Sequence, residues 1–198
     1  MIQFNPLQPS TAGSDGLPVS SLLAFAAIYA VTAAAALLGT GTPIAGLFAA
    51  GILSVFLVAL SAIDLRSFRL PDVLTLPLIA LGLVFTGLFH WDELALRIAA
   101  AACGYLSLYL VATFYQRARG RAGLGLGDAK LFAASGAWLG LEGLPSVLLL
   151  ASVIALVVAG LAYFRGVAVE AGTRIPFGPF LAFGTWIVWL YGPLTFAL

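Results

Sequence analysis

The sequence has very few charged residues for its length. Only 9% of the 198 residues are Asp, Glu, Lys or Arg, whereas a soluble domain carries about 25%. Most of the surface therefore cannot face water, and the 62% share of hydrophobic residues together with a mean hydropathy of +1.10 indicates that it faces lipid. The formal net charge of +1 provides no broad basic surface, so we expect no nucleic-acid partner.

The residues that bind metals or form disulfides are almost missing. The one cysteine, Cys103, excludes an intrachain disulfide, and no Cys-x-x-Cys pair is present to hold zinc. Cys103 lies in an apolar segment, where we expect a small buried side chain. The one histidine, His90, lies in a loop beside Trp91. We therefore expect no metal site.

Long apolar runs, by contrast, fill the chain. A helix needs about 20 apolar residues to cross the hydrocarbon core. Seven segments reach or approach this length: 20–39, 44–63, 73–89, 95–115, 129–144, 146–164 and 177–197. We expect an all-α polytopic membrane protein, a bundle of about seven transmembrane helices, with residues 1–19 as a polar tail and 20–198 as one membrane-embedded domain. The fifth segment is either a short span or re-entrant.

Basic residues gather in alternate connections between these segments. Eight of the nine Lys and Arg residues follow the second, fourth or sixth segment. Short loops rich in Lys and Arg stay on the cytoplasmic side of a membrane. This pattern predicts that the N-terminus is cytoplasmic and that the C-terminus lies outside.

Two aspartates are predicted to meet at the cytoplasmic edge. Asp64 ends the second segment and Asp128 opens the fifth, and the two intervening segments return the chain to the same side. Two carboxyl groups at one semi-buried site share a proton. The ionised group can then take a proton from water while the protonated group donates a hydrogen bond to a peptide carbonyl. Such a pair hydrolyses a peptide bond without a metal.

Each aspartate also has a structural interpretation. Asp128 follows a flexible glycine-rich stretch, where an aspartate is a good helix N-cap. Asp64 lies at the end of a helix that disfavours anions, and an ion pair with Arg66 or Arg69 would explain it.

The surrounding polar and proline residues have two interpretations as well. Asp72 follows a proline and is expected to be an N-cap. Lys130 either extends to the lipid headgroups or tunes the nearby Asp128. Pro176, Gly178 and Pro179 either stop a helix at its N-terminus or form one wall of a substrate groove.

Gly123, Gly125 and Gly127 superficially suggest a phosphate-binding loop. No strand precedes them and no Gly-Lys-Ser/Thr follows, so this interpretation is disfavoured. Glycine lets another backbone approach closely, and we expect these residues to accommodate an extended substrate.

Three blocks of sequence carry a family resemblance. Residues 125–128 (Gly-Leu-Gly-Asp) match the GxGD signature of the membrane aspartic proteases, within the longer block 123–131 that continues to 136–140. The second block is 63–66 (Ile-Asp-Leu-Arg) with 70–78, and the third is 175–182 (Ile-Pro-Phe-Gly-Pro-Phe-Leu-Ala). Together they resemble the bacterial type IV prepilin peptidases.

The resemblance implies a specific activity and location. It implies an aspartic endopeptidase of the bacterial inner membrane, with Asp64 and Asp128 as its catalytic pair at the cytoplasmic face. Its partners would be type IV prepilins or type II secretion pseudopilins, together with membrane lipid. Gly125, Gly127, Lys130, Asp72, Pro176, Gly178 and Pro179 would form the active-site loop and the possible substrate groove.

The resemblance also bears on cofactors. Many relatives N-methylate the new amino terminus with S-adenosylmethionine and carry a segment with two Cys-x-x-Cys pairs. This chain contains no such pair. We therefore expect the peptidase core without the zinc segment, without methyltransferase activity and without a cofactor.

Three other functions stay open on the sequence. Another GxGD intramembrane protease would use the same aspartates on different substrates. A proton- or ion-coupled transporter could use the pair, although transporters favour inverted repeats and midplane sites, which the sequence lacks. A noncatalytic membrane scaffold would keep both aspartates as helix caps.

Overall fold

The chain folds into a bundle of α-helices, as expected. The computed structural model describes residues 27, 29–30, 44–120, 125–164 and 176–194, and all regular structure among them is helical. The elements are α2 (Ile44–Ser67), α3 (Asp72–Phe89), the short 3-10 helix η1 (Trp91–Glu93), α4 (Leu94–Arg119), α5 (Leu126–Leu139), α6 (Gly143–Phe164) and α7 (Gly178–Tyr191). The expected polar tail lies outside the described residues, as does the first expected segment except for residues 27, 29 and 30.

Four of these helices are long and apolar enough to cross a membrane. They cover Gly46–Ser67, Asp72–Phe89, Trp91–Arg119 and Gly143–Leu161. In contrast, α5 and α7 have 14 residues each, about 21 Å at 1.5 Å per residue, which is shorter than a hydrocarbon core of about 30 Å. The fifth segment is thus short, as expected.

Two glycines explain where the short helices end. The segment expected at 129–144 forms a helix over Leu126–Leu139, because Gly140 adopts a φ of 78° that stops it. Similarly, α7 ends at Tyr191 rather than near residue 197, because Gly192 has a φ of 83° and a proline follows. Positive φ is open to glycine at little cost.

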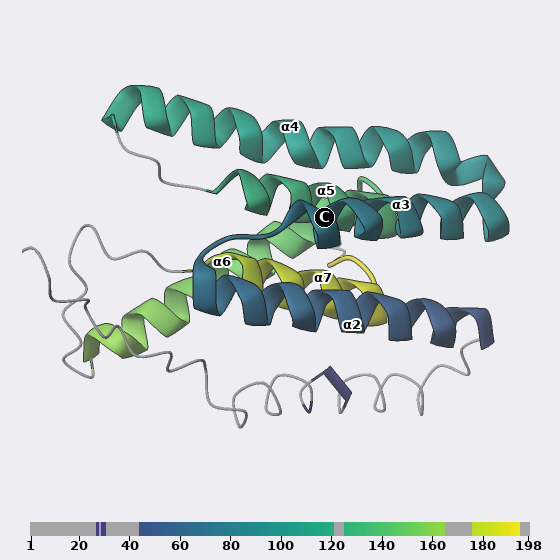
Figure 1. The fold of residues 1–198 in the computed structure, drawn as a ribbon, viewed down its shortest axis with the longest axis horizontal. Helices are drawn as coiled ribbons and strands as arrows, with labels where there is room; N and C mark the ends of the chain where they lie inside the picture. The colour runs from purple at the N-terminus through teal and green to yellow at the C-terminus, as the bar shows by residue number, and fades with distance from the viewer. Residues whose placement is uncertain (1–26, 28, 31–43, 121–124, 165–175, 195–198) are drawn as a thin grey trace, which may run out of the picture.

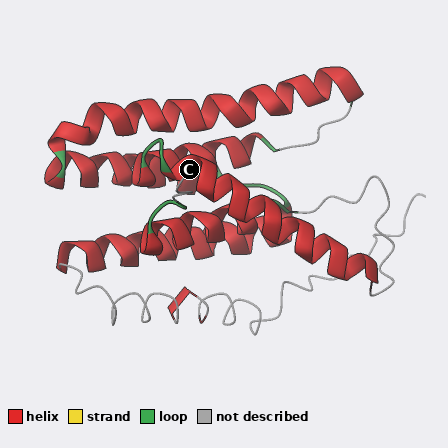
Figure 2. Cartoon of the chain, turned by 180° about the vertical axis from the view of Figure 1, so that it is seen from behind, coloured by secondary structure: helices red, strands yellow, loops and turns green. Residues whose placement is uncertain are grey.

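The helices run alternately in opposite directions, and α5 lies at the centre (Figure 1). It packs against α3, α4, α6 and α7. Every residue of α5 from Asp128 to Trp138 is buried except Lys130. Seen from behind, α6 crosses the bundle obliquely (Figure 2). Apart from Asp128, Lys130 and Ser135, α5 consists of apolar and small residues, which suits this central position.

Small residues bring α4 and α5 into close contact. On α4, the residues that face α5 include Ala100 and Gly104, one turn apart. A Cβ added at Gly104 would lie 2.8 Å from the carbonyl oxygen of Phe132, and one added at Gly136 would lie 2.5 Å from that of Ala100. Helices in lipid associate through such close packing, because lipid is as apolar as the side chains.

The narrow contact stripe on α4 corrects one expectation. Cys103 is exposed on α4 and not buried, because it lies one position away from the stripe that contains Gly104. In a membrane, this face of α4 contacts lipid, so an apolar segment does not place its cysteine inside the protein.

Trp138 ties the far end of α5 to its neighbours. Its indole N–H donates a 2.9 Å hydrogen bond to the carbonyl of Leu78 on α3, and Gly82 provides the space for the ring. The guanidinium of Arg97 on α4 donates to the backbone carbonyl of Trp138 and forms an ion pair with Glu93. A cation that binds the last carbonyls of a helix stabilises its C-terminus.

Candidate active site

The two predicted aspartates lie at the same end of the bundle and share a cavity. Figure 1 shows that α2, α4 and α6 end, and α3, α5 and α7 begin, toward this end, on the left of the view. The cavity has a volume of about 440 Å³. Its lining residues are Asp64, Phe68, Arg69, Leu70, Pro71, Asp72, Gly125, Leu126, Gly127 and Asp128. Parity of the apolar segments therefore placed Asp64 and Asp128 correctly relative to each other.

Asp64 is held by the first residue of α7. It lies one turn before the end of α2 and is 5% exposed. The backbone N–H of Gly178 donates a 3.0 Å hydrogen bond to its Oδ2 atom. Arg66 and Arg69, the expected ion-pair partners, are both exposed, and the hydrogen bond to the Asp64 carboxylate comes from the backbone of α7.

Asp128 lies in the first turn of α5 and is 8% exposed. The N-cap of α5 is Gly125 in an extended conformation, so the N-cap interpretation of Asp128 is wrong. Asp128 belongs to none of the four helices long enough to span the membrane. The pKa of Asp128 is raised to about 7, first by burial and then by the charge of Asp64, and a hydrogen bond from the backbone of Gly125 partly offsets both effects.

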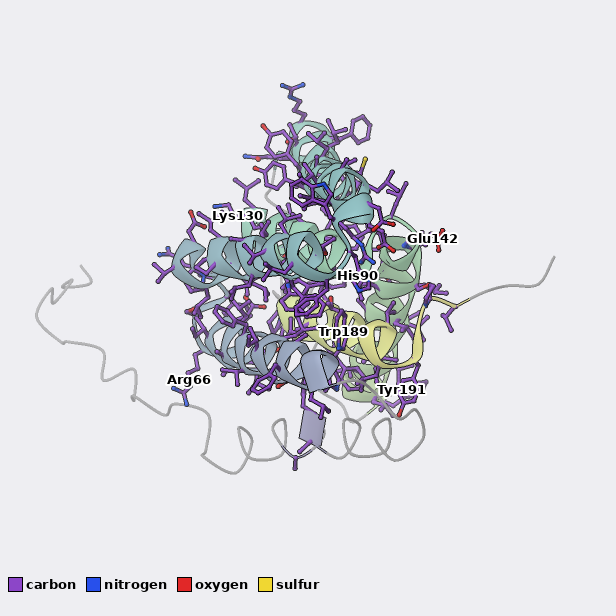
Figure 3. All side chains as sticks on the ribbon, turned by 90° about the vertical axis from the view of Figure 1, so that its right-hand side faces the viewer. Arg66, His90, Lys130, Glu142, Trp189 and Tyr191 are labelled. Carbon is purple, nitrogen blue, oxygen red and sulfur yellow. The ribbon has the colours of Figure 1, made fainter. Side chains whose placement is uncertain are left out.

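Lys130 and Asp72 form an ion pair that links α5 to α3. The Nζ atom of Lys130 donates to Oδ1 of Asp72, and Figure 3 labels Lys130 at the edge of the bundle beside α3. Asp72 is the first residue of α3 and its N-cap is Pro71, so the N-cap expectation for Asp72 is wrong. Lys130 pairs with Asp72 and not with Asp128. Asp72 lines the cavity, whereas Lys130 does not.

The glycines of the predicted loop serve contacts within the chain. Gly125 and Gly127 both line the cavity. A Cβ added at Gly127 would lie 2.8 Å from the Cβ of Leu70, so this glycine lets the α2–α3 connection pack against the start of α5. Their expected contact with a substrate backbone stays a prediction.

The proline-containing segment lies beside the cavity and not in its lining. Pro179 occupies the first turn of α7, which agrees with the helix-start interpretation. None of Pro176, Gly178 and Pro179 is among the lining residues. Gly178 instead contacts Asp64, and a Cβ added there would lie 2.6 Å from Oδ2 of the carboxylate.

Phe68 is a cavity residue that the sequence did not reveal. It has a φ of 51°, the one positive φ outside glycine in the part of the chain that the structure describes. Strained backbone of this kind often occurs at functional sites. A phenylalanine after an apolar helix carries no signal of such a conformation, which is normally indicated by glycine.

Three carboxyl groups line the cavity, those of Asp64, Asp72 and Asp128. Among the described residues, no three His, Cys, Asp or Glu side chains are grouped as metal ligands would be. The arrangement consists of two buried carboxyl groups, an exposed arginine and an ion pair around one cavity. It can hold a water molecule and exchange protons with it.

Comparison with known proteins identifies relatives of the chain. Residues 51–160 match the model of the type IV leader peptidase family, and this region includes Asp64 and Asp128. Three relatives are each named "Prepilin leader peptidase/N-methyltransferase". The relative from Xanthomonas campestris is 43% identical over 73% of this chain and 50% of its own length. The one from Aeromonas salmonicida is 44% identical over 77% and 52%, and the one from Aeromonas hydrophila is 40% identical over 88% and 60%.

The chain spans about half the length of the curated relatives it matches. No solved structure shows a significant match to it.

Proposed function

Because the chain belongs to the type IV leader peptidase family, we propose that it hydrolyses the leader peptide bond of type IV prepilins or type II secretion pseudopilins. One observation supports this proposal above the others. Two buried carboxyl groups, from helices that are not adjacent in sequence, line one cavity at the end of a membrane bundle. An aspartic peptidase requires two such carboxyl groups to activate water and to protonate the carbonyl oxygen.

In the proposed reaction, the two carboxyl groups share one proton and activate one water molecule. The ionised group takes a proton from the water, whose oxygen forms a bond to the carbonyl carbon. The protonated group gives its proton to the carbonyl oxygen, and a gem-diol results. Collapse of the diol breaks the C–N bond, the proton taken from water passes to the leaving nitrogen, and the other carboxyl group recovers its proton. Asp64 and Asp128 are the proposed catalytic residues.

The proposed location of the reaction is the cytoplasmic face of the bacterial inner membrane. The cavity end of the bundle carries exposed basic residues, namely Arg66, Arg69, Arg117 and Arg119. The end marked by His90 and Glu142, which faces the viewer in Figure 3, is not basic in this way. Lys and Arg concentrate on the cytoplasmic side of membrane proteins, so the positive end would face the leader of a substrate still in the cytoplasm.

The proposed chemistry needs neither a metal nor an organic cofactor. Each proton transfer begins and ends on Asp64, Asp128, water or substrate, and no electron acceptor takes part. N-methylation of the product is not part of the proposal. Cleavage by the purified protein should therefore proceed in the presence of a chelator and without S-adenosylmethionine.

The decisive experiment measures cleavage of a co-expressed prepilin. Asp64→Asn and Asp128→Asn retain side-chain size but remove the acid, and each should lower kcat/KM by about 10²–10⁴-fold. Asp92→Asn, an exposed acid at the opposite end, is the matched control and should leave cleavage unchanged. Mass spectrometry of the substrate's amino terminus reports the cut bond and any added methyl group.

The outcomes distinguish the proposal from its alternatives. Retained cleavage by both Asn variants would rule out the carboxyl-pair mechanism. Loss of a prepilin leader only when another peptidase is present would instead favour a transporter or scaffold. Cleavage of unrelated membrane segments with no cleavage of prepilin would favour a GxGD protease of another substrate class.

A further inference from the structure

Gly178 is positioned against Asp64 in a way that only glycine allows. Its N–H donates to Oδ2 at 3.0 Å. A Cβ at this position would lie 2.6 Å from Oδ2 and 3.0 Å from Cγ of the same carboxylate. Contacts below 3.0 Å force one group to move, so a side chain at residue 178 would push the carboxylate and the start of α7 apart.

The start of α7 provides more than one favourable interaction with a negative charge. Gly178 is the first residue of a 14-residue helix, and its N–H is one of those that have no partner within the helix. The helix dipole adds partial positive charge at this end. A hydrogen bond from such an N–H to a carboxylate is charge-assisted and stronger than one between neutral groups.

The two carboxyl groups therefore have unequal surroundings. Asp64 accepts the 3.0 Å hydrogen bond from the N–H of Gly178 at the start of α7. The backbone of Gly125 also interacts with Asp128, but it lowers the pKa of Asp128 less than burial and the charge of Asp64 raise it. Asp128 is buried and faces the charge of Asp64, and its pKa of about 7 agrees with a group that keeps its proton.

The other charged groups near the pair do not reverse this inequality. The α7 helix carries no charged residue. From α3, the cavity receives Asp72, whose charge is paired with Lys130 of α5. Arg69, in the α2–α3 connection, lines the same cavity and is exposed. Arg66, on α2 itself, is exposed as well.

We propose that Gly178 is a positioning residue whose N–H holds Asp64 as the ionised general base and leaves the shared proton on Asp128, an assignment that rests on the function proposed above. Asp64 then takes the proton of the attacking water and later delivers it to the leaving nitrogen. Asp128 gives its proton to the carbonyl oxygen and recovers it when the C–N bond breaks. The family match covers residues 51–160 and does not include Gly178.

The first test compares two glycines of the same helix. Gly178→Ala should lower kcat by about 10- to 100-fold, the loss expected for a hydrogen bond to a charged group, while KM changes less than about threefold. Its pH optimum should rise, because the base at residue 64 would lose the donor that favours its ionised form. Gly184→Ala is the matched control, because its Cβ would lie 2.8 Å from the carbonyl oxygen of Val147, away from the site.

The control separates positioning from general loosening of α7. Gly184→Ala should reduce thermal stability in detergent but leave kcat per folded molecule and the pH optimum unchanged. Equal effects of both variants on kcat, or an unshifted pH optimum for Gly178→Ala, would overturn the role of Gly178. Loss of cleavage in Asp64→Asn and Asp128→Asn would still support the proposed function in that case.

The second test does not depend on the Gly178 variant or on activity. Infrared spectroscopy at about pH 6 detects a protonated carboxyl group by its C=O stretch, because ordinary aspartates and glutamates are ionised there. The band should be present in the intact protein and in Asp64→Asn, and absent in Asp128→Asn. A band that disappears in Asp64→Asn and persists in Asp128→Asn would place the proton on Asp64 and overturn the assignment.

Discussion

Replacing Asp128 with asparagine should stabilise the protein at alkaline pH and, if the proposed function holds, strongly reduce cleavage. Burial and the charge of Asp64 raise the pKa of Asp128 from an ordinary 3.8 to about 7. Between these two values the folded protein binds a proton that the unfolded chain has lost. Stability therefore falls as pH rises through this window, and the loss is complete above the folded-state pKa.

The pKa shift sets the size of the effect. A difference of about three pKa units corresponds to about 4 kcal/mol at 1.36 kcal/mol per unit. Asparagine does not ionise, so the Asp128→Asn variant should avoid this loss. It should gain up to about 4 kcal/mol over the intact protein near pH 8 and almost nothing near pH 4. In a chain of this size, that gain corresponds to an increase in Tm of about 10 °C.

Thermal unfolding in detergent, followed by tryptophan fluorescence, measures this difference. Trp138 and Trp186 are buried and report on the packing around α5 and α7. The comparison is the Tm of the variant minus that of the intact protein at a series of pH values. Asp92→Asn, at an exposed acid, should give a difference that is small and constant. A constant difference for Asp128→Asn as well would refute the claim that burial suppresses the charge of this carboxyl group.

Two further predictions concern packing and backbone strain. Gly136→Ala should cost about 1–3 kcal/mol, because its Cβ would lie 2.5 Å from the backbone of Ala100. In the control Gly51→Ala, the added Cβ would meet nothing within 4 Å, so this variant should instead stabilise α2 by about 0.5–1 kcal/mol. Equal changes in the free energy of unfolding for Gly136→Ala and Gly51→Ala would contradict the packing account. Phe68→Gly should preserve stability or raise it by about 1 kcal/mol, because it relieves a φ of 51°. Clear destabilisation of this variant would show that the exposed ring of Phe68 packs more favourably than its backbone is strained.

The hydropathy pattern alone was enough to predict much of the fold. Residues 73–89 were expected as a helix and form α3 over Asp72–Phe89, and 146–164 correspond to α6 over Gly143–Phe164. The same pattern predicted that Asp64 and Asp128 lie at one end of the bundle, because this prediction needs only the number of apolar segments between them. These predictions concern length and direction, which a run of apolar residues specifies directly.

The packing of one helix against another could not be predicted in the same way. Lipid and protein interior are both apolar, so the outer and inner faces of α4 look alike in the sequence, and Cys103 was placed wrongly for that reason. The Lys130–Asp72 ion pair and the contact of Gly178 with Asp64 depend on which helices are neighbours. Nothing in the spacing of residues along the chain specifies those neighbours.

Polar contacts at the two ends of α5 fix its axial position in the bundle. Lys130 joins its first turn to Asp72 of α3, and Arg97 of α4 binds the carbonyl of Trp138 in its last turn. An axial shift of α5 would have to break both of these contacts and move Gly136 against the backbone of α4. The carboxyl group of Asp128 therefore stays at one level along the bundle axis. In the proposed peptidase, the depth at which a substrate helix emerges from the membrane would then select the cleavage position.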